Sequence, residues 1–133
     1  MENKRKHLEF IQGVINKMAG NSFFLKGWAI TLIAALFALS AKDANPKYIF
    51  IAYFPVIMFW VLDGYFLSQE RLFRDLYDDV RKLDEKEIDF SMDTRKYKKN
   101  KRNSWLSSMS SLTLLWFYLS LIFIMLFIVY LIN

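Results

Sequence analysis

The sequence predicts an all-α integral membrane protein in which the whole chain, residues 1–133, forms one membrane domain. Hydrophobic residues make up 55% of the chain although 23% of its residues are charged, and the two classes are separated into blocks. Three blocks carry almost no charge, at 23–41, 48–67 and 112–132. Each is roughly 28–32 Å long as a helix, which matches the hydrocarbon core of a bilayer. We therefore expect three transmembrane helices.

The basic residues predict which side of the membrane each loop faces. Of the 18 Lys and Arg residues, five lie in residues 1–26 and eleven in 68–111, whereas 42–47 has two. The residue after Ile132 is uncharged. Because cytoplasmic loops are enriched in Lys and Arg, we expect the N-terminus and segment 68–111 in the cytoplasm and the C-terminus on the opposite side.

Residues 4–19 are predicted to form a cytoplasmic amphipathic helix before the first span. Leu8, Ile11, Ile15 and Met18 recur at helical spacing and form an apolar face. The Lys- and Arg-rich start of this helix would also suit the surface of an anionic leaflet.

The first span carries small residues at helical spacing, which lets a neighbouring helix approach closely. They are Gly27, Thr31, Ala34, Ala35 and Ala38. Asn45-Pro46 predicts a tight turn into the second span, so that the two spans form an antiparallel hairpin. The pattern leaves open whether the small residues face the second span or another subunit.

Two ionisable residues interrupt the apolar blocks of the hairpin. In a hairpin centred between Ala44 and Asn45, Lys26 and Asp63 stand at the same depth near the cytoplasmic boundary. An ionisable residue inside a span indicates either a paired charge or a functional site. We expect a Lys26–Asp63 pair that fixes the hairpin register. The alternatives are a ring of Asp63 carboxylates at a pore mouth, or side chains that extend to the interface.

Residues 68–88 are predicted to continue the second span as a cytoplasmic helix. One face of this segment is apolar, with Leu72, Leu76, Val80 and Leu83. Its other face carries opposite charges four residues apart, among them Asp78–Lys82 and Arg81–Glu85, and such pairs favour a helix. The apolar faces of 4–19 and 68–88 could pack on each other within one chain or between subunits as a cytoplasmic collar.

Segment 94–111 is a basic juxtamembrane stretch with six cations and no acidic residue. It could anchor the chain on anionic lipid. It could also bind a polyanion such as a nucleotide or a short oligonucleotide, with an aromatic ring available for stacking on a base. The candidate ligand-binding residues are Arg95, Lys96, Tyr97, Lys98, Lys99, Lys101 and Arg102.

The third span, 112–132, has one weakly polar face. Thr113 and Ser120 share this face with Ile124 and Phe127. Such a stripe fits a contact between helices, or the lining of a pore in which Ile124 and Phe127 form a hydrophobic constriction.

The composition argues against most enzyme chemistry. The chain has no cysteine, a single histidine, His7, and four widely spaced glycines. Cysteine-ligated metals, multi-histidine metal sites within one chain and glycine-rich phosphate loops are therefore excluded. We expect a protein that is not an enzyme and that uses neither a cofactor nor a metal.

The block Ile11-Gln12-Gly13-Val14-Ile15-Asn16-Lys17-Met18-Ala19-Gly20-Asn21-Ser22-Phe23, followed by a two-span hairpin, resembles small transmembrane effectors of bacterial anti-phage defence. The nucleotidyltransferase-linked Hailong effector and the two-span SLATT type are similar over roughly residues 8–90, although the third span departs from the latter. The resemblance implies a homo-oligomer in the bacterial inner membrane that permeabilises it when a nucleotide or nucleic-acid signal changes. It also implies a cytoplasmic nucleotide-synthesising partner.

These observations lead to one functional hypothesis and one rival. The hypothesis is an oligomeric, pore-forming or channel-like effector, gated from the cytoplasmic side by a nucleotide, a nucleic acid or a partner. The rival is a non-conducting membrane anchor or assembly subunit that recruits a cytoplasmic partner. A small transporter is disfavoured because the sequence shows no inverted repeat.

Overall fold

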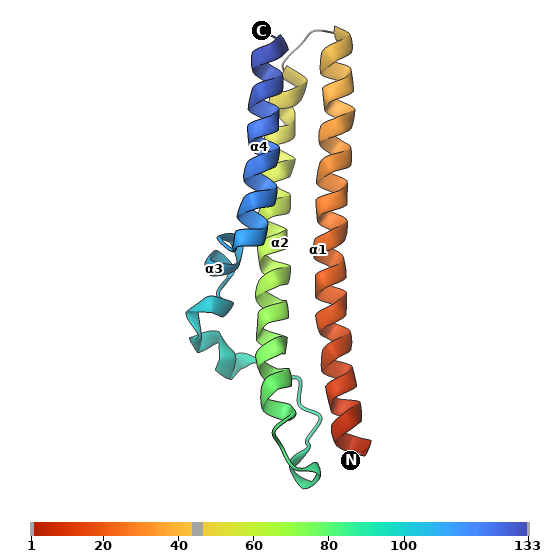
Figure 1. The fold of residues 1–133 in the computed structure, drawn as a ribbon, viewed down its shortest axis with the longest axis vertical. Coiled ribbons are helices and arrows are strands. Elements are labelled where there is room, and N and C mark those ends of the chain that lie inside the picture. The colour runs from red at the N-terminus through yellow and green to blue at the C-terminus, as the bar shows by residue number, and fades with distance from the viewer. Residues whose placement is uncertain (1, 44–46, 133) are drawn as a thin grey trace.

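The structure, a computed structural model, describes residues 2–43 and 47–132 and is helical throughout its regular elements (Figure 1). Three long helices dominate it: α1 (Glu2–Asp43), α2 (Lys47–Val80) and α4 (Leu112–Ile132). Each is long and apolar enough to cross a membrane. Between α2 and α4 lie the short helix α3 (Trp105–Met109) and the 3-10 turns η1 (Glu85–Glu87), η2 (Arg95–Lys99) and η3 (Lys101–Asn103).

Helix α1 is one uninterrupted helix of 42 residues, roughly 63 Å long. It joins the amphipathic segment 4–19 and the apolar block 23–41, which the sequence pattern treats as two elements. No proline occurs in it, and the glycines at 13 and 20 are tolerated in a helix at a cost of about 1 kcal/mol each relative to alanine. In Figure 1, α1 runs the full length of the molecule beside α2.

Helix α2 ends at Val80, so the prediction of a helix over 68–88 is wrong for its last eight residues. The predicted pairs Asp78–Lys82 and Arg81–Glu85 are not among the ion pairs between described residues. Arg81 contacts Asp78 at 3.5 Å, and the carboxylate of Glu85 instead accepts the backbone N–H groups of Asn3 and Lys4 at 2.8 and 3.1 Å. Glu85 thereby satisfies donors at the start of α1 that have no partner within the helix.

The chain reverses direction after Val80, and burial of its apolar side chains against α1 and α2 favours this reversal. Leu83, Ile88 and Met92 pack against a buried cluster between α1 and α2. Burial of half an aliphatic side chain stabilises by about 1 kcal/mol, whereas a charge pair on a helix surface contributes about 0.2–0.5 kcal/mol. Phe90, at the reversal, has a left-handed backbone (φ 56°), and its ring lies 5.6 Å from that of His7.

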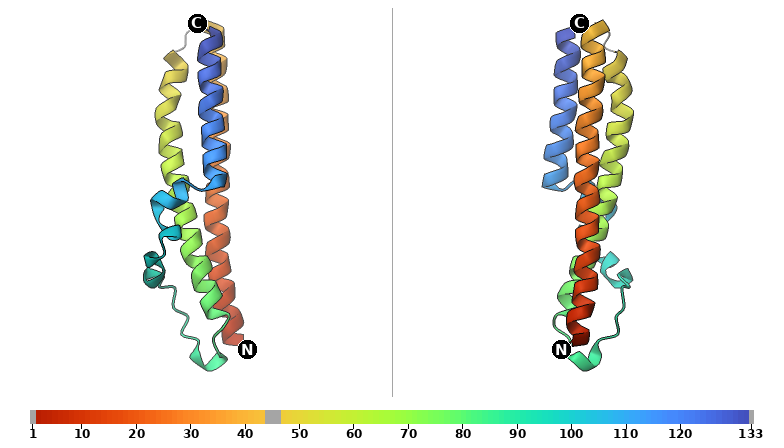
Figure 2. Two further views of the ribbon diagram at one scale, coloured as in Figure 1. Left: turned by 60° about the vertical axis from the view of Figure 1, so that its left-hand side comes forward. Right: turned by 90° about the vertical axis from the view of Figure 1, so that its right-hand side faces the viewer.

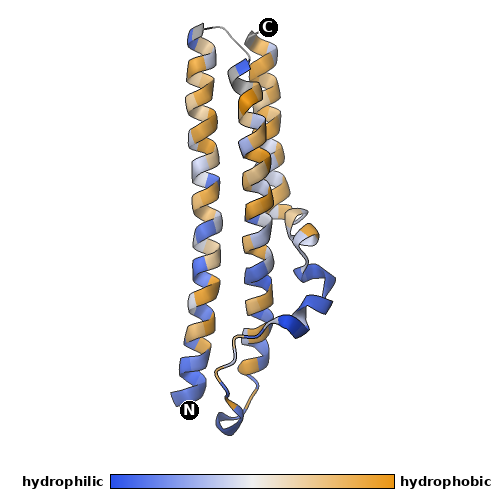
Figure 3. Ribbon diagram, turned by 180° about the vertical axis from the view of Figure 1, so that it is seen from behind, coloured by the Kyte–Doolittle hydropathy of each residue, from blue (hydrophilic) through white to orange (hydrophobic). Residues whose placement is uncertain are grey.

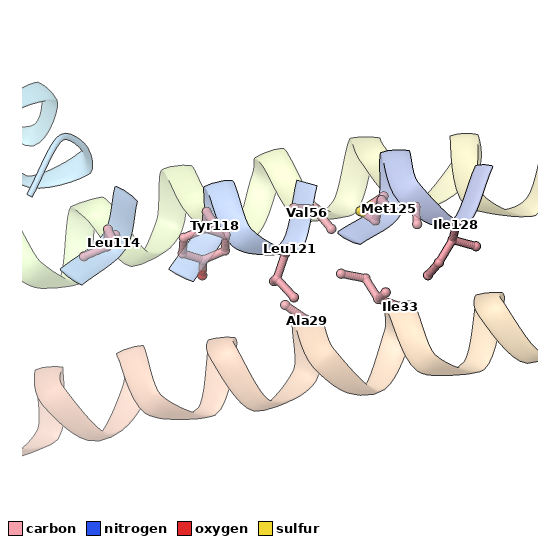
Figure 4. Close-up of a cluster of buried hydrophobic side chains, with 9 residues drawn as sticks. Ala29, Ile33, Val56, Leu114, Tyr118, Leu121, Met125 and Ile128 are labelled. Carbon is pink, nitrogen blue, oxygen red and sulfur yellow. The ribbon is translucent and has the colours of Figure 1, made fainter. Parts of the chain in front are cut away.

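Helix α4 has the bounds that the sequence predicts, and it lies alongside α1 and α2 (Figure 2). The apolar core between the three helices is shown in Figure 4. Five core residues recur at helical spacing along α4: Leu114, Tyr118, Leu121, Met125 and Ile128. They pack against small or branched side chains of the hairpin: Ala29, Ile33, Ala52 and Val56. The predicted turn at Asn45-Pro46 lies outside the described residues.

Hydrophilic residues are concentrated towards the N-terminal end of α1 and the C-terminal end of α2, where they alternate with hydrophobic ones (lower part of Figure 3). We call the opposite end of the molecule the apolar half and this end the polar half. A second core lies there between α1 and α2, formed by Ile11, Ile15, Leu76 and Val80. The apolar faces of the predicted helices 4–19 and 68–88 therefore pack on each other within one chain. Phe10 and Phe90 remain exposed beside this core.

The small-residue stripe of α1 points away from the rest of the chain. The buried face of α1 carries Ala29, Ile33 and Ser40, whereas the stripe lies on the opposite, exposed side. A Cβ added at Gly27 would meet nothing within 4 Å. The structure thus answers the question left open by the sequence: the stripe does not contact the second span.

Candidate functional site

The most distinctive polar site lies where the polar and apolar halves meet. Asp63 of α2 is completely buried, and the Nζ atom of Lys26 on α1 lies 2.6 Å from its Oδ2 atom. The Lys26 side chain is 20% exposed, so the pair has one edge open. The structure therefore brings together the two residues that the hairpin symmetry places at the same depth.

Two further residues complete this site, and the sequence analysis did not identify either. Ser22, one turn before Lys26, donates its hydroxyl to Oδ1 of Asp63 and accepts a hydrogen bond of 2.7 Å from Lys26. Tyr118 of α4 donates its hydroxyl to Oδ2 of Asp63 at 3.0 Å. We call Ser22, Lys26, Asp63 and Tyr118 the boundary network.

The boundary network connects all three long helices through one carboxylate. Asp63 accepts hydrogen bonds from a hydroxyl of α1, an ammonium of α1 and a phenol of α4, so its buried charge is both paired and solvated by protein groups. Trp60 stacks on Tyr118 with ring centroids 5.8 Å apart and fixes the position of the phenol. The sequence does contain one indication that Tyr118 is buried: it shares a helical face with Leu114, Leu121 and Met125.

The geometry favours one of the interpretations of Asp63 over the others. A carboxylate with no exposed surface cannot face an open pore mouth or extend to the interface in this arrangement. The contacts are those of a pair that fixes the register of the hairpin and also the depth of the third helix.

The predicted polar stripe of α4 lies on its outer surface. Thr113, Ser120, Ile124 and Phe127 are all exposed, whereas the buried face of α4 carries Leu114, Tyr118, Leu121, Met125 and Ile128. Ser120 and Ile124 line an open, largely apolar groove along the outside of α4. Ser120, Ile124 and Phe127 therefore lie on the outside of α4, whereas Thr113, near the start of the helix, lines a cavity together with residues of α1 and α2.

The predicted ligand-binding residues of the basic segment are divided by their contacts. Arg95 binds Asp93 at 2.7 Å, and Lys96 binds Asp79 of α2 at 3.3 Å. Lys98 and Lys99, like Lys101, are exposed and make no ion pair within residues 2–43 and 47–132.

Tyr97 belongs to the polar-half core and not to the exposed surface of the basic segment. Its ring packs on the cluster around Leu76 and Val80, and its hydroxyl donates to Asp79 at 2.7 Å. Burial, reinforced by the negative charge of Asp79, raises the pKa of the Tyr97 phenol. A base could stack on this ring only after the ring left the cluster.

Arg102 and Asn103 attach the end of the basic segment to α2. The guanidinium of Arg71 donates to the backbone oxygen of Arg102 at 2.6 Å. The amide of the buried Asn103 donates to Asp75 at 2.6 Å and to the backbone oxygen of Tyr97 at 3.1 Å. The segment is thus folded against α2 and does not hang free.

The chain matches no family model, no curated protein and no solved structure. Its function must therefore be argued from the residues and their geometry.

Proposed function

We propose that this chain is a three-span membrane protein that assembles into an oligomeric, channel-like effector of the bacterial inner membrane. The polar half, with the N-terminus, lies in the cytoplasm, and the C-terminus lies on the periplasmic or extracellular side. The distribution of Lys and Arg supports this orientation. The boundary network then stands at the cytoplasmic edge of the hydrocarbon core.

The proposal rests on the outward orientation of two surfaces: the small-residue stripe of α1 and the weakly polar stripe of α4. The small residues of α1, including Gly27 and Ala35, and the hydroxyl-bearing Ser120 of α4 face away from their own chain. In a bilayer, small residues and hydroxyls favour contacts between helices over contacts with lipid. A second copy of this chain offers the same two stripes, so that helices of neighbouring copies can pack on each other through them.

A conducting path would lie between copies. The interior of one chain is filled by apolar side chains and by the boundary network, so residues 2–43 and 47–132 of a single chain offer no polar route across the apolar half. With the polar stripe of α4 turned to the axis of an oligomer, Thr113 and Ser120 would line the path, and Ile124 and Phe127 would form a hydrophobic gate.

We propose that a nucleotide or a short oligonucleotide controls this gate by binding to the basic segment before α4. Lys98, Lys99 and Lys101 are exposed and unpaired in the described part of the chain, and they lie close in sequence to α4. Neutralising them would release counterions, so binding should weaken steeply with salt. A cytoplasmic nucleotide-synthesising enzyme is the partner that would supply such a ligand, and depolarisation during phage defence is the outcome.

One structural feature favours the rival function, a non-conducting anchor or assembly subunit. The polar half closes its own apolar faces and presents a charged surface on α2, which suits recruitment of a cytoplasmic partner.

Two measurements test the proposal. Mass photometry of the protein in mild detergent should show a multimer, and planar bilayers containing the purified protein should conduct. Ala35→Phe, in the small-residue stripe, should disrupt the multimer, whereas Phe37→Trp, a substitution at an exposed position of the same helix outside the stripe, should not. A monomer contradicts the pore, and a multimer that never conducts supports the anchor.

A further inference from the structure

A cavity of about 340 Å³ opens beside the boundary network, between α1, α2 and the start of α4. Its walls come from three parts of the chain that are distant in sequence. Lys26 lies on α1, Arg71 and Arg74 lie on α2, and Arg102 and Thr113 flank the start of α4. Its volume falls at the lower end of the range for small-molecule sites.

The lining of this cavity is strongly cationic. Four cations line it, against the single carboxylate of Glu70, which is already bound to Arg74 at 3.0 Å. Arg71 and Arg102 have no carboxylate within ion-pair distance in the described part of the chain. The guanidinium of Arg71 donates to the backbone oxygen of Arg102. Burial and the nearby positive charge of Arg102 lower the pKa of Arg71, so two uncompensated cations share this cavity. Such an arrangement is stabilised when an anion enters.

The start of α4 adds hydroxyl groups that can donate hydrogen bonds to an anion in the cavity. Ser111 accepts a long bond of 3.4 Å from the backbone N–H of Leu114, which leaves its hydroxyl hydrogen free to donate into the cavity. The hydroxyl of Thr113 also lines the cavity. The N-terminus of a helix carries partial positive charge and suits an anion. Guanidinium groups bind the oxygens of phosphate in a bidentate manner.

We propose that this cavity binds a phosphate group, held by Arg71 and Arg102 and by the hydroxyls of Ser111 and Thr113. The group comes either from the headgroup of an anionic phospholipid or from a soluble phosphate compound. The lipid source rests on the membrane insertion proposed above, whereas phosphate binding itself requires neither insertion nor conductance. Since Lys26 lines the cavity and also binds Asp63, an occupant acts on the boundary network directly.

The test compares two double variants that lose the same charge. Arg71→Gln with Arg102→Gln removes the cavity cations, and Arg5→Gln with Arg81→Gln removes two exposed arginines from the far end of the polar half. Native mass spectrometry of each full-length protein in detergent counts bound short-chain phosphatidylglycerol during a titration. A parallel thermal-shift titration uses inorganic phosphate.

We expect the cavity variant to bind one of these probes at least tenfold more weakly than the wild type, and the control variant to match the wild type. Loss of phosphatidylglycerol binding assigns the cavity to a lipid headgroup, and loss of inorganic phosphate binding alone assigns it to a soluble compound. Equal binding of both probes by the cavity and control variants overturns the proposal. Arg102→Gln alone repeats the test with the backbone contact to Arg71 intact, so that a folding defect cannot imitate the result. Neither readout depends on conductance, so failure of the pore would leave this site standing.

Discussion

At the scale of single residues, Asp63 is the most demanding group in the molecule. A carboxylate without any exposed surface is stable only when its charge is paired and its oxygens are hydrogen-bonded. Three donors from two other helices meet that requirement. The consequence is that the three helices are held in one relative register by a single side chain.

Replacing Asp63 by Asn should lower the free energy of unfolding by about 3 kcal/mol, near the low end for a broken buried pair because Lys26 keeps some exposure. Adding Lys26→Met should restore part of this loss, since the unpaired ammonium is then gone. Unfolding by SDS in mixed micelles, followed by Trp fluorescence, measures both. If Asp63→Asn instead keeps stability but changes cation preference in bilayers, the carboxylate acts in a pore.

Tyr118→Phe isolates the contribution of the third helix to the boundary network. It removes the hydroxyl that donates to Asp63 but keeps the ring that stacks on Trp60. Hydrogen bonds to charged groups contribute about 1.5–3 kcal/mol, so we expect a loss of that size in the same unfolding experiment. Tyr130→Phe, on the same helix with a side chain 78% exposed, is the matched control and should change little.

Tyr97 predicts how the polar half responds to alkaline pH. Burial raises its pKa in the folded chain above the value of about 10 for a free phenol. The unfolded chain therefore loses this proton first, and the stability from the Tyr97–Asp79 contact is complete below pH 10 and declines as the pH rises above it. Thermal unfolding of the wild type and of Tyr97→Phe, between pH 8 and 11, should show a difference that narrows with pH. A constant difference would mean that the hydroxyl is not held by Asp79.

The contact between Lys26 and Asp63 could be predicted from the sequence because the two positions are related by the symmetry of a hairpin about its turn. Lys26 and Asp63 follow from the geometry of one hairpin, which needs only the position of its turn. Tyr118 could not be found in that way, because its depth depends on how α4 docks against the hairpin. The polar residues of α4 indicate Thr113 and Ser120 instead, but the docking of α4 turns Ser120 outward and places Thr113 beside the cavity at the start of the helix.

At the scale of elements, Gly64 permits a close approach between α2 and α3. A Cβ at this position would overlap with Cγ of Met109 and would lie 3.3 Å from its Cα. The short helix is held there by two indole donors: Trp60 donates to the backbone oxygen of Met109 at 2.9 Å, and Trp105 donates to that of Val61 at 2.8 Å.

Gly64→Ala should therefore displace α3 and destabilise by about 1–3 kcal/mol, the range for overpacking, despite the better helix propensity of alanine. Gly20→Ala is the control, because a Cβ there meets nothing within 4 Å and should stabilise slightly. Thermal unfolding gives the sign of each effect, and the Trp emission reports the loss of the indole contacts. Stabilisation by Gly64→Ala would show that α3 is not packed on α2.

The elements themselves were predictable to different degrees. The uncharged block 112–132 gave the bounds of α4 because hydropathy alone determines a span of that length. The end of α2 could not be read in the same way. The charge pattern of 68–88 favours a helix, but the tertiary contacts of Leu83, Ile88 and Glu85 outweigh those weak local pairs. The 3-10 turns of the basic segment depend on Tyr97 and Asn103 reaching α2, which no local pattern indicates.

At the scale of the whole molecule, the charge asymmetry predicts sidedness. An alkaline phosphatase fused after the C-terminus should be active, because that end lies outside the cytoplasm in the proposed orientation, and a fusion after residue 90 should be inactive. Activity in bacterial colonies with a chromogenic substrate measures both, with immunoblots to confirm equal expression. The reverse pattern would invert every assignment of sidedness.

The continuity of α1 and α2 across the boundary between the two halves has a mechanical consequence. Both helices pass through it without a break, whereas α4 begins only after the bend at Ser110–Ser111. Each helix of the hairpin therefore connects the two halves through its own backbone, whereas the position of α4 along the hairpin depends on its side-chain contacts, among them the hydrogen bond from Tyr118 to Asp63.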